Sequence, residues 1–147
     1  MKINATARIS SVIDNLDSYG LTVGDREESG GEYSAYYEYL SDGARLEYSE
    51  STDGGEVRSS VTVKGEAVTV ERHGAVESRF EFREGVAHES LYGIPPYSFD
   101  TVVTAKKIRL ELGESGGRID LIYNMRIGGA DKAVRMKIWI LKSSDKG

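Results

Sequence analysis

The sequence lacks cysteine altogether, and it contains only two prolines and two histidines among its 147 residues. Without cysteine the chain can form no disulfide, no thiolate metal site and no cysteine nucleophile. This composition suits a reducing compartment. A chain of this length buries roughly two-thirds of its unfolded surface when it folds, so a hydrophobic core can stabilise it without cross-links. We predict one domain over residues 1–147.

Long apolar runs are also missing. No segment approaches the roughly 18 apolar residues that a membrane-spanning helix needs, and Arg8 interrupts the first apolar stretch before it could act as a signal peptide. We therefore expect a cytoplasmic protein with no membrane partner.

Positive charge is scarce relative to negative charge, with 19 basic against 24 acidic residues and a net charge of −5. Neutralising phosphates is the main source of nucleic-acid affinity, so the sequence predicts no nucleic-acid partner. One local basic strip contains Lys106, Lys107 and Arg109. Its ordinary interpretation is an exposed strand face of mixed charge.

Glycine, in contrast, is abundant, with 17 residues. It supplies the positive φ of tight turns, and Asp-Gly is a strong hairpin signal. Turn motifs recur at 41–43, 52–55, 64–66, 72–74, 83–85, 114–117 and 128–131. Their short and regular spacing predicts an all-β barrel or sandwich.

Apolar and polar residues alternate between these turns. This period of two is typical of strands with one face in the core and the other in water. The predicted strands are 2–13, 32–41, 44–52, 55–64, 66–73, 76–83, 86–92, 98–112, 117–128 and 132–142. Short connections make sequence neighbours pair in space. An open sheet of these strands would have two exposed edge strands, and closing the sheet into a barrel removes both. We therefore predict an antiparallel up-and-down barrel of about eight to ten strands, with a sandwich as the alternative.

Two segments fall outside the predicted strands. Residues 14–31 are expected to form a long polar loop, with a short helix at Asn15–Tyr19 as an alternative, and such a loop can cap a barrel mouth. The tail at 143–147 is expected to be disordered. Gly93–Tyr97 contains both prolines and should interrupt the strands, with a cis bond before Pro95 or Pro96 as an option.

No catalytic motif is present. The sequence has no nucleophile elbow, P-loop, Rossmann glycine motif, calcium loop or Glu-x-Glu-x-Lys tunnel motif. His73 and His88 fall on different predicted strands, without a carboxylate at a characteristic spacing. We therefore expect no metal and no cofactor. Whether the protein is an enzyme stays open, with a non-enzymatic function favoured.

Several polar residues continue faces that otherwise belong to the predicted interior. The candidate ligand-binding residues are Arg72, Glu50, His88, Tyr92, Tyr123 and Lys106, the last of which follows Thr104 on the same face. An inward charge is unfavourable unless it is paired or solvated. These residues either satisfy one another, as in an Arg72–Glu50 pair, or extend past the barrel rim, or line a wet cavity. An arginine in such a cavity suits a carboxylate or phosphate, because its fork can bond two oxygens.

Aromatic residues mark candidate contact surfaces. Tyr36 and Tyr37 are adjacent, so one strand should carry tyrosine on both faces. Trp139 lies opposite the Ile138–Ile140 face and should point outward, where it is a candidate homodimer contact.

Five short stretches, in their order and spacing, carry a family resemblance: Val70–Val76, Phe80–Gly85, Leu91–Pro95, Thr104–Gly117 and Leu121–Tyr123. They resemble the YwiB-like family of uncharacterised bacterial proteins with a calycin-like, or lipocalin-like, β-barrel. The resemblance implies a barrel, and calycins usually bind small ligands inside it, although a fold alone assigns no function. The chain has Ile94-Pro95-Pro96-Tyr97 where the family tends to have Thr-Pro-Tyr-Gly.

Three functional hypotheses follow. The favoured one is non-enzymatic binding of a small, anionic molecule inside a calycin-like barrel, with Arg72 as the polar anchor. The first alternative is a structural or protein-interaction domain whose barrel is filled by side chains. The second alternative is a small enzyme that uses a polar cluster in the barrel.

Overall fold

The computed structural model describes residues 2–143, which form ten β-strands and, within that range, no helix. The strands are β1 (Lys2–Leu16), β2 (Glu27–Leu40), β3 (Gly43–Thr52), β4 (Gly55–Lys64), β5 (Ala67–Gly74), β6 (Glu77–Phe82), β7 (Ala87–Ile94), β8 (Tyr97–Gly113), β9 (Gly116–Ile127) and β10 (Ala130–Lys142). They correspond one to one to the predicted strands. The predicted disordered tail, apart from Ser143, lies outside the described residues. None of the described residues forms a helix long and apolar enough to span a membrane.

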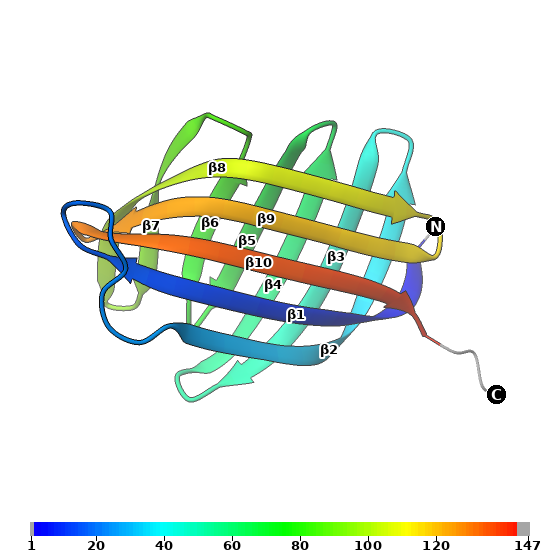
Figure 1. Cartoon of the computed structure of the whole chain (residues 1–147). Coiled ribbons are helices and arrows are strands. Elements are labelled where there is room, and N and C mark those ends of the chain that lie inside the picture. The colour runs from blue at the N-terminus through cyan, green and yellow to red at the C-terminus, as the bar shows by residue number, and fades with distance from the viewer. Residues whose placement is uncertain (1, 144–147) are drawn as a thin grey trace.

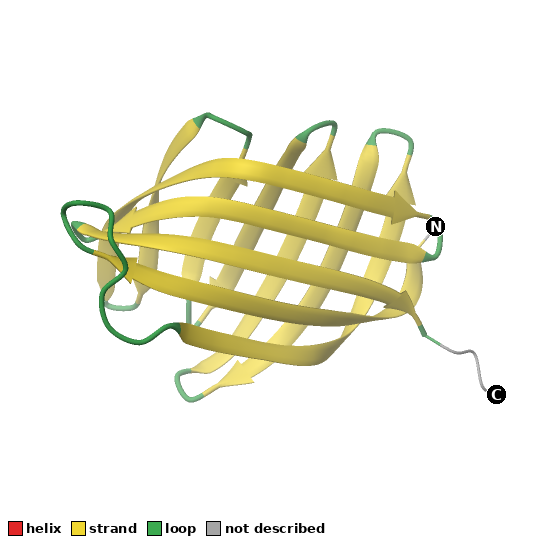
Figure 2. Ribbon diagram, viewed as in Figure 1, coloured by secondary structure: helices red, strands yellow, loops and turns green. Residues whose placement is uncertain are grey.

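The strands close into an antiparallel barrel in which each strand pairs with its sequence neighbours and β1 also pairs with β10. In Figure 1, β8, β9, β10, β1 and β2 cross the front of the barrel and the other strands form its back. Figure 2 shows that loops are confined to the strand ends. The predicted up-and-down barrel is confirmed, and the sandwich alternative is wrong.

Tight turns connect most of the strands. Gly128 and Gly129 join β9 to β10 with φ of 55° and 85°. Two successive positive φ angles are the geometry of a hairpin turn whose twist matches that of its strands. The Pro95–Pro96 bond between β7 and β8 is cis.

The loop between β1 and β2 is shorter than predicted. The two strands extend toward each other until Ile13 pairs with Glu27, which leaves residues 17–26 between them. No helix forms at Asn15–Tyr19. The carboxylate of Asp17 instead accepts the backbone N–H groups of Tyr19 and Leu21, each at 2.9 Å, and this side-chain turn replaces a helical start.

Alternate hairpins place the connections at two ends of the barrel. We call the end that carries the β1–β2 loop the mouth end, and the opposite end, where β1 begins and β10 ends, the terminus end (Figure 1). The mouth end also carries the turns at 53–54, 75–76, 95–96 and 128–129.

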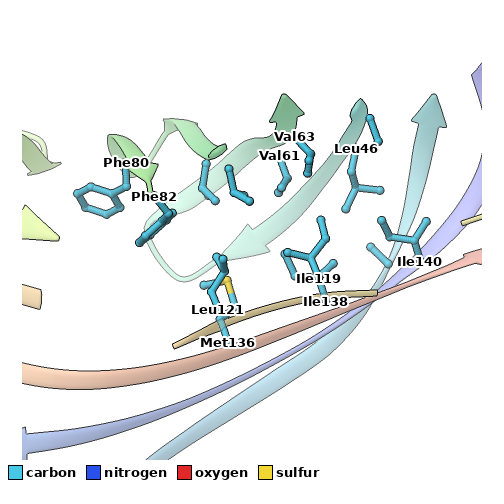
Figure 3. Close-up of a cluster of buried hydrophobic side chains, with 14 of the residues drawn as sticks. Leu46, Val61, Val63, Phe80, Phe82, Ile119, Leu121, Met136, Ile138 and Ile140 are labelled. Carbon is cyan, nitrogen blue, oxygen red and sulfur yellow. The ribbon is translucent and has the colours of Figure 1, made fainter. Parts of the chain in front are cut away.

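Aliphatic side chains fill the terminus end. The buried residues there include Leu46, Val61, Val63, Ile119, Ile138 and Ile140, which interdigitate from facing walls (Figure 3). Tyr37 is completely buried among them, and its hydroxyl donates a hydrogen bond to the carbonyl of Gly113 at 2.8 Å. Its neighbour Tyr36 is exposed, so the prediction of tyrosines on both faces of this strand is confirmed.

Candidate functional site

A cavity of about 300 Å³ occupies the interior toward the mouth end. It exists because β1 and β2 supply small inward residues there. Ser11 lies directly opposite Ser29, and Gly31 lies opposite Ile9. Ser11 and Ser29 both line the cavity. Where larger side chains fill the terminus end, these residues leave space.

The cavity wall is largely aromatic and apolar. Phe80, Phe82, Tyr92 and Tyr123 line it, together with the flexible thioethers of Met125 and Met136. The Phe80 and Tyr92 rings are parallel, with centroids 6.4 Å apart, and Phe82 contacts Tyr123 at 4.6 Å. Figure 3 shows Phe80 and Phe82 beside the aliphatic core. Tyr92 and Tyr123, both predicted as ligand-binding, therefore lie at one cavity.

Arg72 projects from β5 into this cavity. It lies directly opposite Ser59 of β4 and Ser78 of β6, two of the few buried polar residues. Within the described chain, the Nε of Arg72 and the Oγ of Ser59 are buried and have no hydrogen-bond partner. Buried polar atoms without a hydrogen-bond partner are rare, and each requires a specific explanation, such as a catalytic role or a bound water or ion. The inward position predicted for Arg72 is confirmed.

The predicted Arg72–Glu50 ion pair is not formed. Among the described residues no ion pair joins these two side chains, because Glu50 accepts a hydrogen bond from the hydroxyl of Tyr33 at 3.1 Å. Gly31 makes this possible, since a Cβ there would lie 2.6 Å from the Tyr33 hydroxyl oxygen. The Nε of Arg72 has no hydrogen-bond partner within the described chain, although the Arg72 side chain is also hydrogen-bonded to Tyr48.

Two stacked tyrosines complete the polar cluster around Arg72. The rings of Tyr33 and Tyr48 lie 5.2 Å apart. Burial raises the pKa of both phenols, and the nearby Arg72 charge opposes the shift. Burial likewise raises the pKa of Tyr123 to about 12, again against the Arg72 charge. All three phenols are therefore neutral at physiological pH and can donate hydrogen bonds.

Lys132 is a second cation at the cavity, and it is not among the residues predicted to bind a ligand. Its Nζ donates to Asn15 Oδ1 at 2.6 Å and lies 4.0 Å from Glu27 Oε2, so it is anchored near the mouth. The sequence pattern could have predicted its inward position. Lys132 is the first residue of a predicted strand and lies on the same face as Val134 and Met136. No described residue that lines the cavity is a carboxylate.

His88 lies on the inner side of a weak seam between β6 and β7. Only two residue pairs join these strands, Glu77 with Gly93 and Ser78 with Tyr92. Beyond them, the Nδ1 of His88 accepts the backbone N–H of Glu81 at 3.2 Å. This bond replaces a missing rung of the ladder and gives His88 a structural role.

Lys106 does not face the interior as predicted. A β-bulge falls between Ala105 and Lys107, and Lys106 is the extra residue that has no partner on β9. Ala105 is buried, Lys106 is exposed, and the inward alternation resumes at Ile108. The expected inward orientation of Thr104 and Lys106 is therefore wrong. Within residues 2–143, no three acidic or histidine side chains gather closely enough to hold a metal ion.

Comparisons with known proteins agree with this architecture. The family model described as "Domain of unknown function (DUF1934)" matches residues 23–138. The chain is 28% identical over 123 residues to "Uncharacterized beta-barrel protein YwiB" of Bacillus subtilis (strain 168), covering 84% of this chain and 82% of that protein. The crystal structure of the Bacillus subtilis protein superposes with a TM-score of 0.84 at 26% identity, covering 97% of this chain and 94% of that one. The predicted YwiB-like resemblance is thus confirmed, and the chain belongs to the DUF1934 family of β-barrel proteins.

Proposed function

We propose that the protein binds a small organic anion with an apolar body inside the mouth half of the barrel, with Arg72 as the anchor. The observation that carries this proposal is the free Arg72 Nε, which is buried beside Ser59 at a cavity without carboxylates. A guanidinium in such a place favours a carboxylate or a similar oxyanion, because it can donate two parallel hydrogen bonds.

The apolar lining supports an apolar ligand body. Ligand sites are mostly hydrophobic concavities of roughly 300–1,000 Å³ with a few well-placed polar groups. The cavity has a volume of about 300 Å³, which is at the small end of that range. Its aromatic and thioether walls can pack against an aliphatic or aromatic group while the anion lies at Arg72.

The filled-barrel alternative fits only the terminus half. There the interior is closed by aliphatic side chains such as Leu46, Ile119 and Ile138. The mouth half keeps a cavity that contains unsatisfied polar atoms. Burying polar atoms without hydrogen bonds is unfavourable in a purely structural core. Ligand binding therefore explains this half of the barrel better.

Calorimetric titration with hexanoate, 3-phenylpropionate and their neutral amides tests the proposal. We expect the acids to bind more tightly than the amides, because only the acids form charged hydrogen bonds to Arg72. Replacement Arg72→Ala should weaken acid binding about tenfold to a hundredfold and leave amide binding nearly unchanged. The methyl NMR signals of Met125 and Met136, which line the cavity, report the location of binding.

The matched control is Arg79→Ala, which removes an exposed arginine on the neighbouring strand β6 that pairs with Glu71 at 3.4 Å. This variant should bind the acids like the wild type. Equal binding of acids by wild type and Arg72→Ala would remove Arg72 from the site. Absence of any shift of the two methionine methyl signals would argue against a ligand cavity for these acids.

A further inference from the structure

We propose a second binding site, for a chain of phosphate groups, on the outer face of β8, β9 and β10, where the fold brings Lys107, Arg109, Arg135 and Lys137 together. We call these four residues the basic patch. It is independent of the cavity, because it lies on the opposite side of the same barrel wall. The front strands in Figure 1 carry this face.

The strand register assembles the basic patch from segments distant in sequence. Lys107 of β8 pairs with Ile122 of β9, which pairs with Arg135 of β10. One step along, Arg109 pairs with Asp120, and Asp120 pairs with Lys137. The four cations thus stand at the corners of a quadrilateral roughly 7 Å by 10 Å, from the rise per residue and the strand spacing.

The four cations of the basic patch are unpaired, unlike several arginines elsewhere on the surface. Arg8, Arg26 and Arg126 each lie within 2.9 Å of a carboxylate oxygen. Among residues 2–143, no hydrogen bond or ion pair involves any side chain of the basic patch. All four side chains are exposed. Their positive charge is therefore available to a partner.

A hollow of about 180 Å³ lies between the cations, and its floor is formed by Ile122 and Asp120. Asp120 is paired through one oxygen only: its Oδ2 lies 3.2 Å from Arg118 Nε, while its Oδ1 is buried without a hydrogen-bond partner among the described residues. Arg118 in turn lies over the ring of Trp139, 5.0 Å from its centroid. The hollow therefore keeps a surplus of positive charge and has a partly exposed aromatic ring two residues from Lys137.

Phosphate is the anion that this arrangement favours. Two arginine forks and two lysines around one hollow concentrate more charge than single carboxylates would neutralise, and arginine matches phosphate geometry bidentately. The net charge of −5 does not prevent this locally. At physiological ionic strength, charges are screened beyond about 8 Å, so acidic residues farther than that from the basic patch contribute little.

Phosphate chains can come from a nucleic-acid backbone or from inorganic polyphosphate, and the experiment separates the two sources. A short single-stranded oligodeoxythymidine and sodium polyphosphate are each titrated into the full chain, and the fluorescence of Trp139, the single tryptophan, is followed. We expect binding of both at low salt. Quenching by the oligonucleotide alone would identify base stacking on Trp139 and hence a nucleic acid, whereas tighter binding of polyphosphate would identify the inorganic chain.

The salt dependence of the binding constant reports how many phosphate groups the protein contacts. Four phosphate contacts on a single strand predict a slope of about −3 for log K against log salt. The variant Arg109→Gln/Lys137→Gln should halve this slope. The matched control Arg58→Gln/Lys64→Gln also removes one arginine and one lysine, both exposed on β4 at the back of the barrel, and should leave the slope unchanged.

Three results would overturn the proposal. One is the absence of binding by the wild type at low salt. Another is an equal loss of affinity in the control variant, which would show that only the net charge matters. The third is equally tight binding of polyglutamate, which would identify an acidic peptide surface instead of a phosphate site.

Discussion

Tyr37 shows how one side chain can hold two sides of the barrel together. It is fully buried, and its hydroxyl donates across the interior from β2 to the carbonyl of Gly113 at the end of β8. Burial raises the pKa of this phenol to about 12, so it stays a donor over the whole physiological range. The ring fills space and the hydroxyl satisfies a carbonyl.

Replacement Tyr37→Phe should lower the free energy of unfolding by about 1 kcal/mol, because the variant loses this hydrogen bond and leaves the Gly113 carbonyl without it. Urea unfolding followed by circular dichroism measures the change. The adjacent Tyr36 is exposed and provides the control, since Tyr36→Phe should have almost no effect. Equal effects of the two substitutions would mean that the buried hydrogen bond contributes nothing.

His73 is held between two carboxylates on the outer surface. Its Nδ1 lies 3.1 Å from Glu77 and its Nε2 lies 3.4 Å from Glu71. The hydrogen bond to Glu77, followed by the one to Glu71, raises the pKa of the imidazole. Because the folded pKa is the higher one, this contribution to stability is complete below the unfolded value near 6.5 and is lost as the pH rises through the folded pKa.

An NMR titration of the His73 ring protons tests this assignment. We expect Glu77→Gln to lower the pKa of His73 toward its ordinary value, because it removes the larger of the two interactions. Glu66→Gln, at the other end of the barrel in the turn between β4 and β5, should leave the pKa unchanged. A His73 pKa that does not respond to Glu77→Gln would contradict the ion pair.

At the residue scale, the alternation of apolar and polar residues predicted well which side chains point inward. It predicted poorly which groups those side chains contact. It placed Arg72, Tyr92 and Tyr123 inside correctly, because side-chain direction follows from a period of two. It misplaced Lys106, because a bulge adds one residue and leaves no clear signature in the sequence. It could not tell whether Glu50 would bond Tyr33 or Arg72, since that choice depends on side-chain packing across three strands.

At the element scale, close contact between strand backbones limits some positions to glycine. A Cβ on Gly43, at the start of β3, would lie 1.7 Å from the carbonyl oxygen of Val63 on β4. Gly113, at the end of β8, has open space around the same position. Neither residue has a positive φ, so space alone distinguishes them.

Gly43→Ala should therefore destabilise the protein by about 1–3 kcal/mol, because the added methyl group forces β3 away from β4. Gly113→Ala should be neutral or stabilising by up to about 1 kcal/mol, since alanine restricts the unfolded chain. Thermal unfolding of both variants measures the difference. The steric explanation fails if Gly113→Ala is as destabilising as Gly43→Ala.

Element boundaries were predictable where a glycine turn or a change of alternation marks them. Strand β4 was predicted at its observed bounds, because Gly54 precedes it, Gly55 begins it and Gly65 follows it. The mouth-side ends of β1 and β2 were not predicted. Glu27, Glu28 and three glycines or serines follow the loop, and that composition indicates a loop when read locally. Pairing with β1 converts this polar segment into a strand, which is a tertiary effect.

At the scale of the whole molecule, the barrel combines a solid half and a hollow half. The terminus half has the dense aliphatic packing of a core, and the mouth half has aromatic walls, two cations and unsatisfied polar atoms. This division explains how a small domain can keep a cavity and still fold. The filled half supplies the hydrophobic stabilisation, so the mouth half can be shaped for binding.

The buried phenols in the two halves make the stability of the molecule sensitive to alkali. Burial raises the pKa of both Tyr37 and Tyr123 to about 12, whereas an unfolded tyrosine ionises near 10. Above a pH of about 10 the unfolded chain therefore loses protons that the folded chain keeps. Stability should be fully present below about pH 10 and should fall as the pH rises toward about 12, by roughly 2–3 kcal/mol for each phenol.

Urea midpoints measured between about pH 9 and pH 11 test this dependence. The decline should be shallower in Tyr123→Phe than in the wild type, because one buried ionisable group is gone. Tyr36→Phe, which removes an exposed phenol, should keep the full slope. An absorbance titration of the phenolates should show late-ionising tyrosines in the wild type and one fewer in Tyr123→Phe. Identical alkaline slopes in all three proteins would show that the buried phenols do not govern alkaline unfolding.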